Sequence, residues 1–94
     1  MHPDTAYALF EKHEDENLKF ERIPPEDKLH PHSEICGLMK VFACSKEPFH
    51  LSARHENLYV AWIKSVNMTE EDVVYLARCG ICYDDNNNYL YFLT

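Results

Sequence analysis

The sequence predicts an α+β fold: a small single domain with three helices packed on an antiparallel sheet of three to four strands, ending in a C-terminal β-hairpin. Segments with the apolar spacing of helices alternate with short aromatic and β-branched segments that are typical of strands. The length of 94 residues and the hydrophobic fraction of 46% are those of one globular unit. Residues 1–94 are therefore interpreted as one domain.

The first part of the chain is predicted to form a helix followed by a short strand. Residues 2–13 have Pro3 at the first helical position, and apolar residues recur after it at helical spacing. Residues 18–23 alternate between apolar and charged side chains, which predicts an edge strand that ends at two prolines.

A second helix is predicted over residues 31–44. Gly37 lies inside it and lowers helix stability by about 1 kcal/mol relative to Ala, so we expect it to mark a place of close packing. The apolar stripe of this helix comprises Ile35, Leu38, Met39 and Phe42.

The middle of the chain is predicted to contribute an interior strand. Residues 58–63 are apolar on both alternating faces, as a strand buried on both sides requires. We expect residues 49–51 to pair with this strand through a turn at residues 54–57. The main alternative is a helix over residues 56–64.

The C-terminal part carries the clearest local signals. Residues 69–79 are predicted to form a helix that Thr69 caps, that has three acidic residues in its first turn, and that Gly80 ends. Residues 81–84 and 89–93 then form a hairpin around an Asp-Asn-Asn-Asn loop, because Asp and Asn tolerate left-handed backbone conformations.

The charge of the chain limits the partners it can bind. The net charge is −7, and residues 1–34 hold nine acidic residues against four basic ones. This excess disfavours direct binding to nucleic-acid phosphates, whereas it suits a basic surface on another protein. No apolar run approaches the roughly 18 residues of a membrane span, and the N-terminus lacks a signal-peptide pattern. We therefore expect a cytoplasmic protein with free thiols and no membrane contact.

Cys79 and Cys82 form a C-x-x-C motif at the end of a predicted helix. The helix dipole raises the pKa of a thiol there, so a thioredoxin-like redox function is disfavoured. A zinc site is the stronger hypothesis, with His32 and Cys36 as the second ligand pair. The alternative second pairs are Cys36 with Cys44 and His50 with His55. Thiols buried as small apolar side chains are the simplest interpretation of the cysteines.

No catalytic residues are assigned. The chain has no P-loop, no nucleophile elbow and no dinucleotide fingerprint, and its two glycines exclude a glycine-rich phosphate cradle. Six histidines and four cysteines keep a small Cys/His-dependent enzyme as an alternative, although no spacing fixes a nucleophile beside a base.

The tyrosine-rich C-terminus is the most unusual feature of the sequence. In a simple hairpin register, one face carries Tyr83, Tyr89 and Tyr91 while the other carries apolar residues for the core. Tyrosine is enriched at protein interfaces, so the tyrosine face is predicted to bind a partner. The predicted interaction surface also includes Glu14, Asp15 and Glu16.

These observations predict a small acidic, non-enzymatic interaction protein that regulates, adapts or inhibits another macromolecule by presenting an acidic surface to a basic protein partner. The first alternative is a zinc-stabilised module that uses Cys79 and Cys82, and the second is the Cys/His-dependent enzyme. No cofactor other than zinc is expected. A homodimer formed by strand pairing is compatible with the aromatic hairpin.

Overall fold

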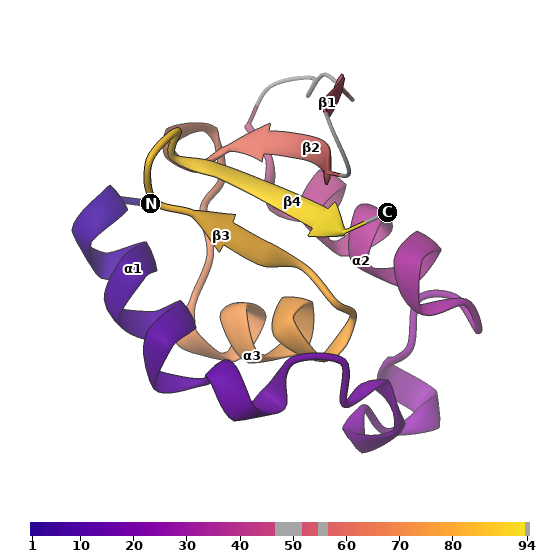
Figure 1. Cartoon of the computed structure of the whole chain (residues 1–94). Coiled ribbons are helices and arrows are strands. Elements are labelled where there is room, and N and C mark those ends of the chain that lie inside the picture. The colour runs from indigo at the N-terminus through magenta and orange to yellow at the C-terminus, as the bar shows by residue number, and fades with distance from the viewer. Residues whose placement is uncertain (47–51, 55–56, 94) are drawn as a thin grey trace.

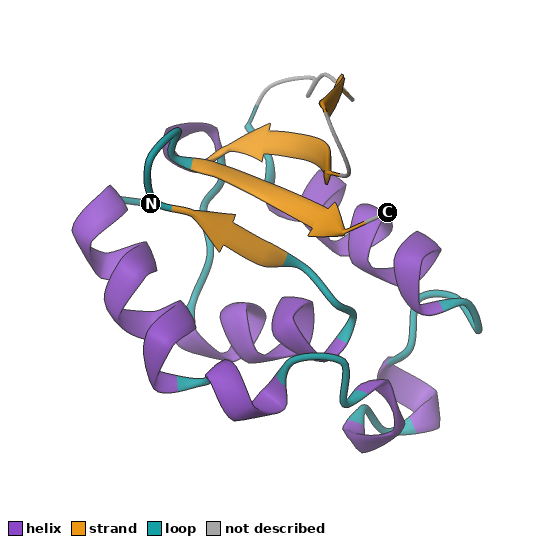
Figure 2. Ribbon diagram, viewed as in Figure 1, coloured by secondary structure: helices purple, strands orange, loops and turns teal. Residues whose placement is uncertain are grey.

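The computed structural model describes residues 1–46, 52–54 and 57–93. The α+β prediction is confirmed within them: three α-helices accompany an antiparallel sheet that ends in a C-terminal hairpin (Figure 1; Figure 2). The elements are α1 (Pro3–Lys12), α2 (Ser33–Cys44), β1 (Ser52–Arg54), β2 (Asn57–Trp62), α3 (Glu70–Arg78), β3 (Cys82–Asp84) and β4 (Tyr89–Leu93). The short 3₁₀ helices are η1 (Glu14–Glu16), η2 (Phe20–Arg22), η3 (Pro25–Asp27) and η4 (Ile63–Ser65). None of these helices is long and apolar enough to cross a membrane.

The described sheet has four strands in the order β1-β2-β4-β3, and every neighbouring pair is antiparallel. Strand β4 lies between β2 and β3, so the chain passes through α3 on its way from β2 to the edge strand β3. The register of β2 against β4 shifts between Tyr59 and Ala61. This bulge turns both Val60 and Ala61 into the core, where they are 0% and 1% exposed.

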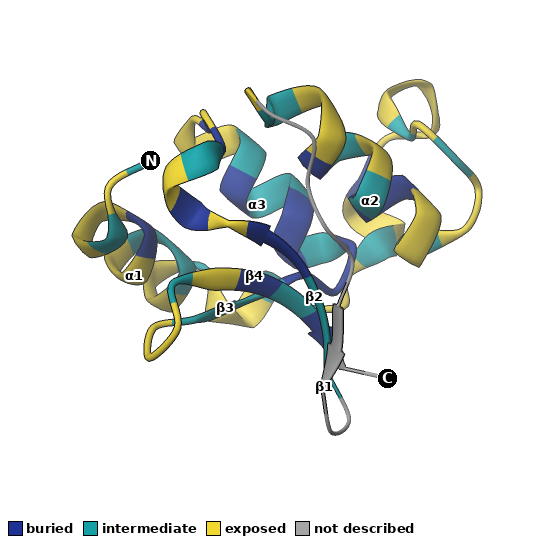
Figure 3. Cartoon of the chain, turned by 90° about the horizontal axis from the view of Figure 1, so that it is seen from above, coloured by how far each residue is buried: buried dark blue, intermediate teal, exposed yellow. Residues whose placement is uncertain are grey.

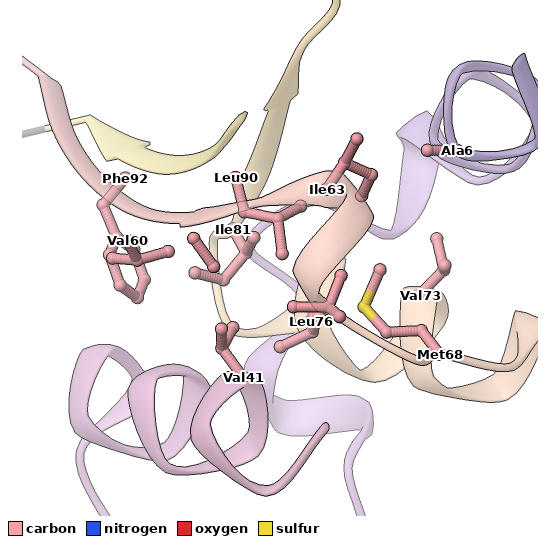
Figure 4. Close-up of a cluster of buried hydrophobic side chains, with 12 residues drawn as sticks. Ala6, Val41, Val60, Ile63, Met68, Val73, Leu76, Ile81, Leu90 and Phe92 are labelled. Atoms are coloured by element: carbon pink, nitrogen blue, oxygen red, sulfur yellow. The ribbon is translucent and has the colours of Figure 1, made fainter. Parts of the chain in front are cut away.

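The helices cover one face of the sheet. Helix α3 contacts both α1 and α2, and α1 also packs against β3. Figure 3 shows α2 and α3 on the same side of the strands. The core between these layers draws its side chains from all three helices and from β2, η4 and β4 (Figure 4). Its members are Ala6, Val41, Val60, Ala61, Ile63, Val66, Met68, Val73, Leu76, Ile81, Leu90 and Phe92.

The predicted strand over residues 18–23 is wrong. Leu18 has a φ of 63°, a left-handed conformation that breaks an extended chain, and η2 follows it. Ile23 is buried in a second apolar cluster, together with Cys36 and Cys79, between η2, α2 and the end of α3. Of residues 18–23, only Ile23 is buried, so the side chains do not alternate between a buried and an exposed face as they would in a strand.

The middle of the chain follows the strand prediction and not its helical alternative. Strand β2 covers residues 57–62, and Ile63 begins η4 in place of ending the strand. The partner of β2 on this side is β1, paired from Ser52 opposite Tyr59 to Arg54 opposite Asn57. The predicted partner segment 49–51 lies outside the described residues.

Helix α2 turns to the core a face that the predicted stripe gives only in part. Leu38 of the stripe packs against the core, but the buried residues of α2 are Cys36, Gly37 and Val41, while Ile35 and Met39 are 41% and 43% exposed. Gly37 lies at a close contact, because a Cβ there would lie 3.0 Å from Cys79 Cβ and 3.1 Å from Phe92 Cζ. The glycine lets α2 approach α3 and β4 along this line, which confirms the prediction of close packing at Gly37.

Candidate functional site

Two of the predicted zinc ligands meet in the structure, but as buried core thiols. Cys36 and Cys79 are 0% and 1% exposed and share the cluster between α2 and α3. Cys36 Sγ lies 3.0 Å from Tyr75 Oη. The Tyr75 hydroxyl donates its proton to Asp27 O at 2.7 Å, so the Cys36 thiol is the donor to the tyrosine oxygen. Burial raises the pKa of the Cys79 thiol well above its ordinary value, which keeps it protonated and unreactive.

The other two predicted ligands lie elsewhere. Gly80 has a φ of 93° and ends α3, and beyond it the Cys82 thiol accepts a hydrogen bond from Asn17 Nδ2 at 3.6 Å. His32 is exposed at the start of α2. Within residues 1–46, 52–54 and 57–93, no group of three or more His, Cys, Asp or Glu residues is arranged to hold a metal ion. The structure therefore does not assemble the four residues of the zinc hypothesis.

The described histidines and cysteines also do not form a nucleophile–base pair. His13 Nε2 lies 2.7 Å from Glu70 Oε2, and the His2 ring accepts a hydrogen bond from the backbone of Asp4. In the described part of the chain, none of the hydrogen-bonded thiols has a histidine side chain as its partner: their partners are tyrosine, asparagine or backbone groups, with Asp72 beside Cys44 and Cys79 beside Cys36. His50 and His55 lie outside the described residues.

The three acidic residues of the predicted interaction surface, Glu14, Asp15 and Glu16, have different surroundings in the structure. Glu16 holds two arginines, with Arg22 Nη1 at 2.8 Å and Arg78 Nε at 2.7 Å, and its side chain is only 15% exposed. Its hydrogen bond to Arg78 outweighs desolvation and lowers the pKa of the carboxyl. Glu16 therefore fastens η1 to the end of α3, whereas Glu14 and Asp15 stay exposed.

The hairpin register corrects the predicted tyrosine face. Tyr83 lies opposite Leu90 and stacks on Phe10 of α1, with ring centroids 5.8 Å apart, so it points to the helix-covered face. Tyr89 and Tyr91 occupy the other face, as predicted, and Tyr59 packs against both. The open face of the sheet therefore carries an aromatic group that the sequence indicated only in part: Tyr59, Trp62, Tyr89 and Tyr91.

The candidate site is an open cleft of about 480 Å³ between α1, η1 and β3. Three aromatic rings contribute to its lining, those of Tyr7, Phe10 and Tyr83. Three carboxylates also line it, those of Glu11, Glu14 and Asp85. We call this feature the acidic cleft. Its remaining described lining residues are His13, Asn17, Ala77, Ile81 and Cys82.

Carboxylates contribute to the raised pKa values of both tyrosines in the acidic cleft. A hydrogen bond from Tyr7 to Glu11, reinforced by the charges of Glu11 and Asp85, raises the pKa of Tyr7. Burial is the main cause of the raised pKa of Tyr83, and the negative charge of Asp85 adds to it. Both tyrosines therefore stay neutral, and the three carboxylates line the cleft together with the aromatic rings.

No described lining residue of the acidic cleft is a lysine or an arginine. The basic residues Lys12 of α1 and Arg22 of η2 form ion pairs with other carboxylates. Lys12 pairs with Glu70 at 2.9 Å, and Arg22 pairs with Glu16. The carboxylates of the cleft therefore have no lysine or arginine beside them among its described lining residues.

Sequence patterns gave only part of this site. The helical spacing of Tyr7 and Glu11 places them on one side of α1, and Glu14 belongs to the predicted surface. Nothing in the sequence indicated that β3 would bring Tyr83 and Asp85 beside them. No protein-family model, no curated protein sequence and no solved structure matches the chain. The function proposed below therefore rests on the geometry and chemistry of the chain itself.

Proposed function

We propose that this chain is a non-enzymatic interaction protein that binds a positively charged segment of another protein in the acidic cleft. One observation carries the proposal: three carboxylates and three aromatic rings line the same cleft, and no described lining residue supplies a compensating lysine or arginine. Carboxylates and ring faces are the two kinds of group that attract an ammonium or guanidinium ion.

The strength of such a contact can be bounded. A cation over an aromatic face contributes about 0.5–2 kcal/mol, and an exposed ion pair contributes at most about 1 kcal/mol. One basic side chain in the acidic cleft is therefore worth only a few kcal/mol, which corresponds to millimolar affinity at best. A useful partner must present several basic residues or further contacts.

The aromatic open face of the sheet offers such further contacts. Cys82 lines the acidic cleft and lies opposite Tyr91 in the sheet, so the cleft adjoins the open face at β3. Trp62 and Tyr89 on that face are 46% and 37% exposed. Tyrosine and tryptophan dominate the energetics of many protein interfaces, and here they would extend the footprint of the same partner.

The proposal also covers the compartment of the protein and the class of its partner. All four cysteines are free, which supports a reducing compartment such as the cytoplasm. The net charge of −7 disfavours direct nucleic-acid binding and favours a basic protein partner. Elemental analysis of the purified protein tests the zinc alternative, and the rate of thiol modification under native conditions tests the Cys/His alternative.

The test of the proposal is calorimetric titration with the basic peptide acetyl-TRTRTRT-amide at low salt. Glu11→Gln and Asp85→Asn each remove one carboxylate from the acidic cleft. Glu34→Gln is the matched control, because it makes the same change in net charge on the first turn of α2, outside the cleft. We expect each cleft substitution to weaken binding about three- to tenfold and the control to weaken it less than about twofold.

Two results would reject the proposal. Undetectable binding of the peptide to the unmodified protein would remove the site altogether. Equal losses in all three variants would show that the peptide responds to net charge alone and does not use the cleft.

A further inference from the structure

The acidic cleft runs along an open sheet edge. Strand β3 pairs with β4 on one side, and it is the last strand in the order β1-β2-β4-β3. Cys82 and Tyr83 of this edge strand line the cleft, and Asp85 follows directly after it. Backbone donors and acceptors on the free side of an edge strand form a template for another extended segment. The acidic cleft and the edge of the described sheet therefore lie at the same place.

We propose that the basic partner segment binds in an extended conformation and adds to β3 as a new strand beside α1. This inference rests on the proposed function and specifies how the partner is held. Main-chain hydrogen bonds to β3 supply part of the affinity, and the alternating side chains of the segment supply the specificity. They also provide the contacts that a single basic side chain in the acidic cleft lacks.

The residues of β3 leave the edge open to a partner while discouraging a second copy of the chain. The sequence Cys-Tyr-Asp of β3 has neither lysine nor proline, and the bulge lies in β2, so the edge is limited only by its length of three residues and by the packing of α1 beside it. Asp84 and Asp85 add negative charge at the end of this edge. A second copy of this edge carries the same negative charge, whereas a basic segment carries the opposite charge and is attracted.

The two faces of the added strand would meet different surroundings. Side chains on the face of Tyr83 point toward α1, where Phe10 stacks on Tyr83 and Glu11 lines the cleft. Side chains on the other face join the row of Cys82 and Tyr91. The partner should therefore carry basic residues at every second position. Arginine suits the site better than lysine, because its planar guanidinium stacks on aromatic rings and donates to two carboxylates at once.

The test compares two N-methylated isomers of acetyl-TRTRTRT-amide with the parent peptide. One isomer is methylated on its three arginine nitrogens, and the other on the last three threonine nitrogens. Residues with side chains on the same face of a strand point their N–H groups to the same side. In strand addition, one isomer therefore blocks the hydrogen bonds to β3, while the other places its methyl groups toward solvent.

We expect one isomer to bind at least about tenfold more weakly than the other, since each lost hydrogen bond costs about 1 kcal/mol. The two isomers have the same charge and composition, so electrostatics alone cannot produce this asymmetry. Equal affinities for both isomers would overturn strand addition and leave cleft binding intact. Failure of the parent peptide to bind would overturn the proposed function and this inference together.

Discussion

The helical layer is packed differently at its two ends. Between α2 and α3, Gly37 removes a side chain, the helices approach closely, and the thiols of Cys36 and Cys79 are sealed inside. Between α1 and β3, the rings of Phe10 and Tyr83 fill the contact at a centroid distance of 5.8 Å, and an open cleft remains beside them. A glycine allows close packing at one end, whereas an open cleft lies beside the stacked rings at the other.

We expect the closed end to contribute mainly to the stability of the fold and the open end mainly to ligand binding. No side-chain nitrogen or oxygen that is buried in the described residues lacks a hydrogen-bond partner. The carboxylates of the acidic cleft, in comparison, face no lysine or arginine among its described lining residues. The closed end should therefore be sensitive to substitutions that change packing, and the open end should tolerate them at the cost of ligand affinity.

The largest expected effect tests this division. Leu76 of α3 is 0% exposed in the core, and Leu76→Ala should lower the free energy of unfolding by about 3 kcal/mol through lost burial and a new cavity. Tyr7 lines the acidic cleft and is 49% exposed, so Tyr7→Ala should cost less than about 1 kcal/mol. Urea unfolding of both variants measures the difference. Similar losses would contradict the expectation that the acidic cleft tolerates substitutions better than the buried core does.

An intermediate effect is expected at Gly80, which joins α3 to the edge strand. Its φ of 93° is strained for any residue with a Cβ, and a Cβ there would lie 2.9 Å from Leu18 Cδ2. Gly80→Ala should therefore cost about 2 kcal/mol, of which about 1 kcal/mol is backbone strain. Measured in a Leu18→Ala background, the same substitution should cost only the backbone part. An unchanged cost in that background would show that Leu18 does not restrict the turn.

The smallest effect concerns the ion pair that joins α2 to α3. Burial opposes ionisation of Asp72, but hydrogen bonds from the Thr69 backbone and from Lys40 outweigh it and hold the Asp72 pKa below its ordinary value. The resulting stabilisation is complete above the unfolded pKa of about 3.9 and is lost as pH falls through the lower folded pKa. Thermal unfolding between pH 6 and pH 2.5 should show a steeper acid loss for the unmodified protein than for Asp72→Asn. Parallel curves would contradict this contribution.

Local signals predicted the elements that local chemistry determines. Thr69 caps α3 in a reciprocal arrangement with Asp72, Gly80 ends it with a positive φ, and Asn88 takes a φ of 60° in the hairpin loop. Each of these features depends on residues within a few positions of one another. They follow from capping and left-handed preferences that act before any tertiary contact forms.

The errors lie where long-range packing decides. The face that α2 buries depends on the approach that Gly37 permits toward Cys79, and apolar spacing along α2 cannot show this. The face of Tyr83 depends on its register opposite Leu90. The acidic cleft depends on α1 and β3 lying side by side, although they are far apart in the sequence. Residue pairs of this kind leave no signal in a single sequence.

The most direct test of the acidic cleft is an NMR titration of the ¹⁵N-labelled protein with acetyl-TRTRTRT-amide. We predict that backbone amide shifts concentrate on residues that line the cleft, above all Tyr7, Glu11 and Tyr83, while the amides of α2 around Glu34 stay unchanged. Shifts spread evenly over the acidic surface, or centred on α2, would contradict the assignment of the cleft as the binding site.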